Sequence, residues 1–527
     1  MKKYRKTLFI CIILLLFSII CYFARLQQSK IDSLNLFIYQ LSKGNQIRSI
    51  IAAVLIVGLG LGTLMNMNLY SSDAKLLILL STPVGVALWG ILSILVLLSG
   101  IRYSATTMFT TCIILEILIF FVRRRKKIVL QYNTDELLNI CMLVFGIICV
   151  LSTGIFYVFS AGDTITYIDI LGKAFVIEGG FSEHFETIFL STGIALAPLS
   201  SLTYMLGSNN IYLIHSMFLL NFFFFFWYVA YKKIADSIYK KHSEIISFIC
   251  VLLILSMPPI LYLSGWIISN VYIMCYLFIL AILFLDLDYS SKADVGSSII
   301  IGIFCVFFVY LRSDAAITLS CFVLSGVIEQ ISSKKMICTV ILPSIFAMIL
   351  YYGKIYLILG TDGKGLFLDV KTIGAMLFLL IVMMIYYIFF RNKRFLFLQE
   401  NLVLFVTIML LLVIFFLYII SPEVFLRSIN VYNINITDIS SQGGFWGGTG
   451  IFILMMLLLA RIYNSRKIKC IEFLVVILVL TNVIMGPLRA YLGMEPRIGM
   501  GDSFNRAFIS YLPLSLWGIY DRIFVEK

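Results

Sequence analysis

The chain has 527 residues, of which 61% are hydrophobic and only 13% are charged, and its mean hydropathy is +1.04. These values exclude a soluble globular protein, which needs a charged surface around its core. The net charge of +13 would suit a nucleic-acid-binding protein. The basic residues, however, stand in short clusters beside apolar runs, where anionic headgroups attract them. We therefore expect membrane lipid, and no nucleic acid, as a partner.

About sixteen apolar runs follow one another along the chain, and a run of roughly 17 to 25 residues is what a helix needs to cross a bilayer. Spans in lipid must satisfy their own backbone hydrogen bonds, so long continuous runs predict helices rather than a β-barrel. The predicted fold is an all-α polytopic integral membrane protein with about 14–16 transmembrane helices. A re-entrant or kinked segment is expected at 256–268 or at 308–318. The expected spans are residues 7–24, 49–69, 76–100, 104–122, 136–160, 211–231, 245–263, 268–285, 296–311, 315–331, 337–359, 372–390, 402–420, 444–460, 470–487 and 507–520.

Clusters of Lys and Arg fall in alternate gaps between these spans. With the N-terminus inside, the inner segments carry 26 of the 40 Lys and Arg residues and the outer segments carry 14. Positive charge in short loops marks the cytoplasmic side. We therefore expect a multi-pass protein of the plasma membrane with both termini in the cytoplasm. The basic start and the apolar run 7–24 lack a small-x-small cleavage site and predict an uncleaved signal anchor.

Two parts are expected along the chain. Residues 1–134, with the first four spans, end in the basic stretch 123–127 and predict an accessory bundle. Residues 135–527 form the expected core, which includes a long outer loop at 161–210. In the second span, Gly58, Gly60 and Gly62 predict close packing of helices rather than a binding site.

The outer loop 161–210 opens with Asp163 and Asp169. The stretches 168–177 and 181–196 are mildly amphipathic and predict helices that lie along the interface. A carboxylate at a helix end, covered by interfacial helices, can act as a general base away from water. Asp163 can equally be an ordinary helix cap. His184 is a further candidate, although a lone interfacial histidine more often makes only a local hydrogen bond.

The last outer segment carries Arg489, Arg497 and Arg506 on a side that is otherwise poor in positive charge. Guanidinium groups match phosphate oxygens in bidentate geometry, and the membrane boundary strengthens that attraction. Arg506 stands at the start of the final span and needs a partner there. That partner is either Asp502, one turn earlier, or a lipid-linked phosphate.

Arg312 and Asp314 form another pair, at the expected outer turn between the ninth and tenth spans. They are either a snorkelling anchor or part of the same anionic region. The eleven cysteines lie in or at the ends of apolar runs, without a CxxC motif and without histidine neighbours, and are interpreted as packing residues. No cofactor is certain. A divalent metal is possible, but no cluster of ligands supports it.

Taken together, an Asp at the start of a long outer loop with interfacial helices and a distal arginine near the outer leaflet resemble the GT-C superfamily of integral membrane glycosyltransferases. Residues 499–514, with Gly-Asp-Ser-Phe-Asn-Arg followed by Pro513, are similar to a stretch in bacterial members linked to cell-envelope polysaccharide. Unlike the usual layout, the acidic loop here follows the fifth span.

The resemblance implies transfer of a sugar from a polyprenyl-phosphate donor to a glycan, lipid or protein acceptor on the extracytoplasmic face. Asp163 would take the proton of the acceptor hydroxyl. Arg506, with Arg489 or Arg497, would bind the donor phosphate, and Arg312 is a secondary candidate. Three alternatives stay open: a polysaccharide polymerase or ligase that depends on the arginines and not on Asp163, a flippase or transporter of lipid-linked oligosaccharides, and a non-catalytic lipid-binding subunit.

Overall fold

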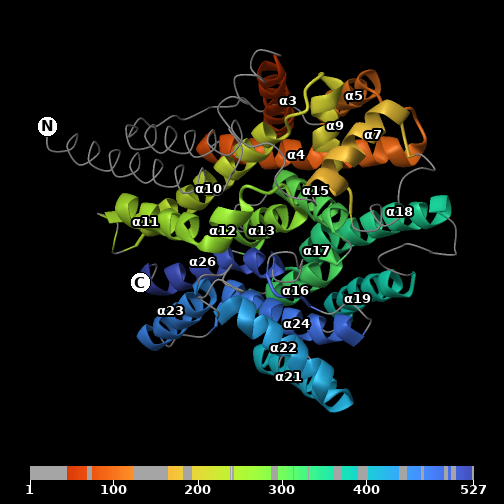
Figure 1. Cartoon of the computed structure of the whole chain (residues 1–527). Coiled ribbons are helices and arrows are strands. Elements are labelled where there is room, and N and C mark those ends of the chain that lie inside the picture. The colour runs from red at the N-terminus through yellow and green to blue at the C-terminus, as the bar shows by residue number, and fades with distance from the viewer. Residues whose placement is uncertain are drawn as a thin grey trace, which may run out of the picture. The chain divides into compact units, whose positions relative to one another are not determined.

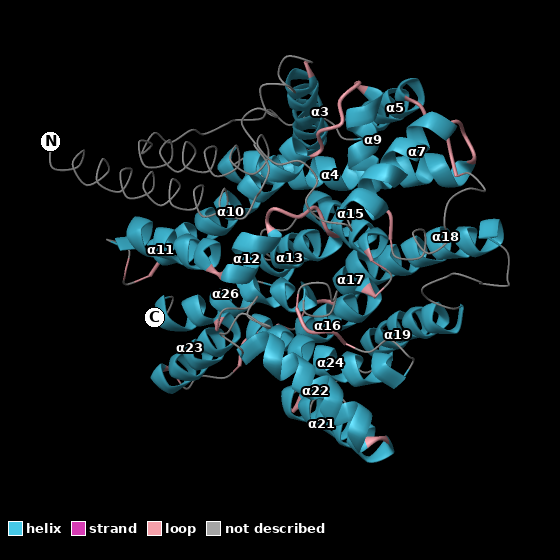
Figure 2. Ribbon diagram, in the orientation of Figure 1, coloured by secondary structure: helices cyan, strands magenta, loops and turns pink. Residues whose placement is uncertain are grey.

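The computed structural model describes residues 44–67, 74–122, 164–181, 193–237, 239, 242–285, 295–312, 314–329, 331–359, 370–389, 401–437, 448–464, 468–491, 496–499 and 506–524. Within these ranges the chain is almost entirely helical and has no β-strand (Figures 1 and 2). The all-α prediction is thus confirmed for this part of the chain. The expected spans 7–24 and 136–160 lie outside the described residues. So does the boundary expected at residues 134–135, which stays a prediction.

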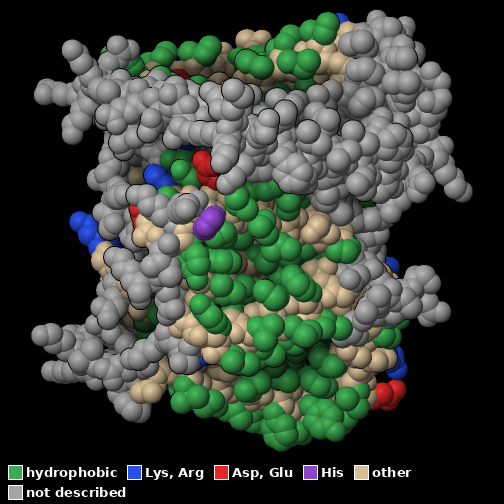
Figure 3. Space-filling model, turned by 90° about the vertical axis from the view of Figure 1, so that its left-hand side faces the viewer, with side chains coloured by type: hydrophobic (Ala, Val, Ile, Leu, Met, Phe, Trp, Pro, Cys, Tyr) green, Lys and Arg blue, Asp and Glu red, His purple; other side chains and the backbone are tan. Residues whose placement is uncertain are grey.

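Six helices in the described part are long and apolar enough to cross a membrane: Asn45–Asn66, Lys75–Ser99, Tyr212–Ala235, Ser333–Ile355, Leu402–Ile420 and Cys470–Tyr491. Shorter apolar helices accompany them, as a polytopic membrane protein requires. In helix Leu402–Ile420, only 6% of the most apolar stretch is buried inside the protein. On the face drawn in Figure 3, hydrophobic side chains gather over the centre and lower part of the described surface, and charged ones lie mainly toward its edges. Such a surface needs an apolar covering, which a bilayer provides.

The chain divides into two compact units, and unit 1 comprises Met1–Phe185, Ile194–Phe225 and Gly265–Ile267. A helix is present at the expected stretch 168–177, as α7, preceded by a π-helical turn; its place along the membrane interface stays a prediction. The second expected stretch, 181–196, lies mostly outside the described residues, and α9 after it was not expected. The elements of unit 1 are α3 (Asn45–Asn66), α4 (Ala74–Ser99), α5 (Ala105–Val122), η1 (Thr164–Asp169), α7 (Ile170–Glu178), α9 (Ala197–Met205) and the first part of α10 (Tyr212–Ala235).

Helices α3 and α4 pack with almost no space between their backbones. A Cβ atom added to Gly60 would lie 1.8 Å from the Ser81 carbonyl oxygen, and one added to Gly85 would lie 1.9 Å from the Ile56 carbonyl oxygen. The predicted close packing is therefore present at Gly60. Gly58 has open space at the same position, so only one of these two glycines serves the contact.

Unit 2 comprises Glu186–Gly193, Phe226–Ser264 and Ile268–Lys527. Its helices follow the expected spans closely, with one break and one addition that are described below. The elements are the end of α10, α11 (Ser243–Ser256), α12 (Pro258–Leu263), α13 (Ser269–Leu280), η3 (Ala281–Leu285), α15 (Val295–Leu311), α16 (Ala315–Ile328), α17 (Ser333–Met336), η4 (Ile337–Ile341), α18 (Leu342–Leu359), α19 (Val370–Phe389), α21 (Leu402–Ile420), α22 (Pro422–Thr437), α23 (Thr449–Tyr463), α24 (Cys470–Tyr491), η7 (Phe508–Tyr511) and α26 (Leu512–Phe524).

The expected span 245–263 is broken between α11 and α12. Met257 adopts an extended conformation with ψ 123°, because a residue before proline avoids the α region. The kink expected at 256–268 is therefore present. The addition is α22, a 16-residue helix in an expected outer loop that packs against α21, α23 and α24 (Figure 1).

The core of unit 2 is aromatic where α10, α13 and α26 meet. The ring centroid of Phe226 lies 4.9 Å from that of Phe278 and 6.0 Å from that of Trp517. Beside this core lies an ionic cluster made of Lys233, Lys469, Glu472, Asp521 and Arg522. Asp521 pairs with both lysines, and the Arg522 guanidinium donates to both oxygens of Glu472. The cluster joins α10, α24 and α26 at one end of the unit.

Candidate functional site

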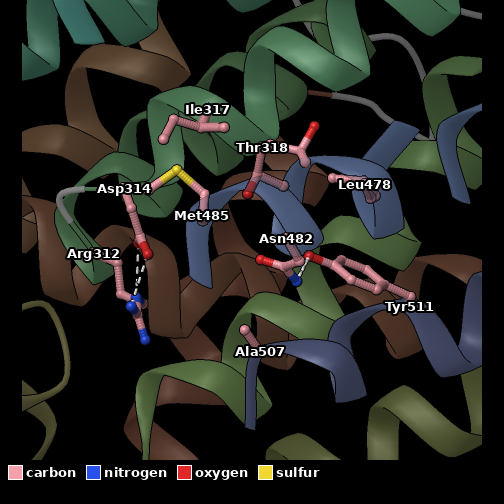
Figure 4. A pocket seen from close by; sticks show the side chains of 10 residues that line it. Arg312, Asp314, Ile317, Thr318, Leu478, Asn482, Met485, Ala507 and Tyr511 are labelled. Carbon is pink, nitrogen blue, oxygen red and sulfur yellow. Dashed lines mark hydrogen bonds and ion pairs between the residues drawn. The ribbon is translucent and has the colours of Figure 1, made fainter. Parts of the chain in front are cut away.

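A pocket within unit 2 lies between α16, α24 and the start of the C-terminal segment (Figure 4). We call it the arginine pocket. Its cavity volume is only about 40 Å³, room for a few water molecules, so it is a small depression that is partly open to its surroundings. Its lining residues are Arg312, Asp314, Ile317, Thr318, Leu478, Thr481, Asn482, Met485, Ala507 and Tyr511.

Arg312 and Asp314 form a bidentate ion pair at the rim of this pocket (Figure 4). The Arg312 Nε atom donates to Asp314 Oδ1 at 2.8 Å, and Nη2 donates to Oδ2 at 2.7 Å. Asp314 occupies the N-cap position of α16, yet its side chain makes no capping hydrogen bond. The carboxylate is used to hold the guanidinium instead. Arg312 carries five N–H groups, more than one carboxylate can accept, so the pair retains the capacity to bind a further anion.

The charge state of Asp314 follows from its neighbours. Burial raises the pKa of its carboxyl. The charge and hydrogen bonds of Arg312, together with the charge of Arg489, lower that pKa by more than burial raises it. The net pKa lies below the ordinary value of 3.8. Asp314 is therefore ionised at neutral pH and partly offsets the positive charge of the two arginines.

The opposite wall of the pocket is polar but uncharged. The Asn482 Nδ2 atom on α24 donates a hydrogen bond to the Tyr511 hydroxyl on η7 (Figure 4). Thr318 on α16 and Thr481 on α24 add hydroxyl groups to the lining. Hydroxyl and amide groups of this kind orient a sugar or a phosphate ester without adding charge.

The predicted arginines are placed differently with respect to this pocket. Arg489, in the last turn of α24, is half-buried, and its charge reaches Asp314. Arg506 is buried, with 6% of its surface exposed, and directly precedes the pocket-lining Ala507. Arg497 is exposed on the segment that follows α24. The fold thus pairs Arg312 with Asp314, brings the Arg489 charge within electrostatic range of that carboxylate, and places Arg506 next in sequence to the wall.

Of the predicted Asp and His site residues, Asp169 lies within the described ranges. Asp163, His184 and Asp502 lie outside the described residues. Asp169 belongs to unit 1, where it is 8% exposed and accepts hydrogen bonds from the Ser200 hydroxyl at 2.7 Å and from the Tyr204 hydroxyl at 2.9 Å. Burial raises the pKa of Asp169, and these two hydrogen bonds oppose that shift. Its carboxylate holds α9 against η1.

Sequence reasoning did not select the uncharged lining of the pocket. Thr318 on α16 and the neighbouring residues Thr481 and Asn482 on α24 are uncharged polar residues inside apolar spans. One available signal is the spacing of the lining residues on α24. Leu478, Asn482 and Met485 recur at helical intervals, so they share one face of that helix. A polar residue on that face would have marked it as turned toward a polar space.

Within the described ranges, no three His, Cys, Asp or Glu side chains come together as a group of metal ligands. Comparison of the chain with models of known families, with curated proteins and with solved structures found no match.

Proposed function

We propose that this chain is a multi-pass plasma-membrane glycosyltransferase of the GT-C type, which transfers a sugar from a polyprenyl-phosphate donor to a glycan, lipid or protein acceptor on the extracytoplasmic face. One observation carries the proposal. Arg312 forms an ion pair with an ionised carboxylate, Asp314, in a pocket between apolar helices, and the charge of Arg489 also acts on that carboxylate. The excess positive charge suits a phosphate, and the surrounding apolar surface suits its lipid tail.

The size of the pocket favours a headgroup over a whole lipid. A cavity of about 40 Å³ is too small for a lipid, so in this proposal the phosphate binds at the open rim beside Arg312, whereas the isoprenoid chain would lie in the bilayer beside the exposed apolar helices. A guanidinium already held in a fixed orientation by Asp314 loses little freedom when it binds a phosphate. Arg312, Arg489 and Arg506 would then stabilise the negative charge that develops on the leaving phosphate.

The chemical step requires a base for the acceptor. In the proposed reaction the acceptor oxygen forms a bond to the anomeric carbon of the sugar while the bond from that carbon to the phosphate oxygen breaks. Asp163 takes the proton of the acceptor hydroxyl, and the polyprenyl phosphate leaves with the electron pair. Asp169, His184 and Asp502 stay the secondary candidates that the sequence offers for this reaction.

A second candidate function is an envelope-polysaccharide polymerase or ligase. The observation in its favour is that Asp314 already supplies a carboxylate within the arginine pocket. An enzyme of this kind would join lipid-linked oligosaccharides with the help of the arginines, and Asp163 would be dispensable.

The test compares single variants of the full-length protein. The chromosomal gene is replaced by one that encodes Asp163→Asn or Arg506→Ala, and the envelope glycan of the source cell is then analysed. We expect both variants to insert normally and to lose sugar transfer. The matched control is Arg427→Ala, because Arg427 is an exposed arginine on α22 that forms an ion pair with the exposed Glu423; it should transfer at the normal rate. Normal transfer by Asp163→Asn with loss in Arg506→Ala would favour the polymerase or ligase, and normal transfer by both would refute either enzyme.

A further inference from the structure

One face of helix α22 contacts residues that form or flank the arginine pocket. Tyr432 and Asn435 are three residues apart, so their side chains leave the helix on the same side. Tyr432 is 4% exposed and Asn435 is 0% exposed. The opposite side of α22 carries the exposed pair of Glu423 and Arg427. The helix is therefore amphipathic, with a short polar contact inside its buried face.

Asn435 holds the segment that follows α24 by two hydrogen bonds. Its Nδ2 atom donates to the Arg497 carbonyl oxygen at 3.1 Å, and its Oδ1 atom accepts from the Gly499 backbone N–H at 2.7 Å. One side-chain amide thus pairs with a donor and an acceptor two residues apart on one stretch of backbone. Gly499 has φ +90°, a conformation that favours glycine. The carbonyl and N–H of this segment are fixed by α22 rather than by a regular element of their own.

Tyr432 connects the same helix to the wall of the pocket. Its hydroxyl lies 3.4 Å from the Asn482 carbonyl oxygen, and its ring packs edge-on against Phe508 with centroids 5.6 Å apart. Gly486 on α24 makes room for it, since a Cβ atom there would lie 2.2 Å from the Tyr432 hydroxyl oxygen. Asn482 lines the pocket and Phe508 follows the lining residue Ala507. Movement of α22 would therefore shift the uncharged wall of the pocket, which α24 and the C-terminal segment form together.

We propose that Asn435 is a positioning residue for the arginine pocket. It fixes Arg497 and Gly499 at one end of the segment that leads to Arg506, while Tyr432 fixes the wall that begins at Ala507. A backbone segment that is anchored at one end has fewer conformations. The segment that carries Arg506 therefore loses less conformational entropy when Arg506 binds a ligand. Asn435 acts through Arg506 and does not touch the bound phosphate. This inference rests on the proposed function for its ligand, and on the hydrogen bonds for its mechanism.

The first test measures binding of a short-chain polyprenyl monophosphate to the full-length protein in lipid nanodiscs. Loss of two hydrogen bonds in Asn435→Ala should weaken binding about tenfold. Asn435→Asp keeps the acceptor for the Gly499 N–H, so its affinity should lie between those of the wild type and Asn435→Ala. The matched control is Asn433→Ala, the same change at an exposed position two residues away on the same helix, which should bind as the wild type does.

A double-mutant cycle separates positioning from a general loss of structure. If Asn435 acts through Arg506, adding Asn435→Ala to Arg506→Ala should weaken binding no further. An equal loss in both backgrounds would overturn the inference. So would a lower melting temperature without any change in affinity, because that is the result for a residue that only stabilises the fold.

A ligand-independent readout covers the case in which the wild type does not bind the probe, which would count against the proposed function. Trypsin cleaves after arginine, and Arg497 is exposed while its carbonyl oxygen is held by Asn435. Mass spectrometry of the fragment ending at Arg497 should show faster cleavage in Asn435→Ala than in Asn433→Ala. Equal cleavage rates would refute the anchoring by Asn435 regardless of what the pocket binds.

Discussion

Lys233 on α10 and Asp521 on α26 form an ion pair of 3.2 Å in which the two side chains are only 9% and 6% exposed. Lys469, directly before α24, also pairs with Asp521, so segments from three distant parts of the sequence meet at one carboxylate. Because both basic segments belong to clusters that the sequence predicts on the inner side, this end of unit 2 is the end at which we expect the cytoplasm.

Asp521→Asn should strongly destabilise unit 2. The substitution leaves two lysines around a neutral group, and removing one partner of a buried pair costs about 3–5 kcal/mol. The measurement is the free energy of unfolding in mixed micelles. Glu423→Gln is the matched control, because the Glu423–Arg427 pair has the same 3.2 Å distance but is exposed; its cost should stay within about 0.5 kcal/mol. Similar costs for both variants would contradict a buried role for Asp521.

The contribution of Asp314 to stability should depend on pH only in acid. Its pKa in the folded protein is lowered below 3.8. The stabilisation is therefore fully present above the unfolded value of about 3.9 and is lost as the pH falls through the folded pKa. The difference in melting temperature between the wild type and Asp314→Asn should be constant from about pH 5 to pH 8 and shrink below about pH 4. A difference that changed between pH 6 and pH 8 would refute the assignment of this pKa.

Gly60→Ala should separate α3 from α4. The added methyl group would lie 1.8 Å from the Ser81 carbonyl oxygen, which belongs to backbone and cannot rotate away. We expect a loss of about 1–3 kcal/mol, seen as a lower melting temperature. Gly58→Ala is the same change two residues earlier, where the space is open, and should stay within about 1 kcal/mol of the wild type. If the two variants melted together, the close contact at Gly60 would be wrong.

The predicted orientation can be tested by labelling single cysteines in a background without the native ones. Ile498 is 49% exposed beside the arginine segment, and Tyr463 is 65% exposed at the end of α23. An impermeant maleimide added to intact cells should label Ile498→Cys, and it should label Tyr463→Cys only after permeabilisation. The reverse pattern would place the arginine pocket on the cytoplasmic side and remove the basis of the proposed extracytoplasmic reaction.

The agreement between sequence and structure is best where a span is uniformly apolar. The expected span 402–420 coincides with α21, Leu402–Ile420, because a continuous apolar run leaves the backbone no alternative to a helix in lipid. Local chemistry also located the break at Met257 before two prolines. Helix α22 was missed because it is too polar to count as a span, although its amphipathic pattern was present in the sequence.

The sequence by itself determined the long apolar helices of the described ranges, their approximate ends and the identity of the arginines, since each depends on hydrophobicity and charge along a single segment. Only the tertiary structure decided that Arg312 and Asn482, 170 positions apart, line one pocket, and that Asn435 holds the backbone at Arg497 and Gly499. The physical reason is that an apolar helix face can pack against lipid or against another helix with similar energy. Which faces meet is therefore set by shape and by a few polar contacts, and these appear only when the helices are placed together.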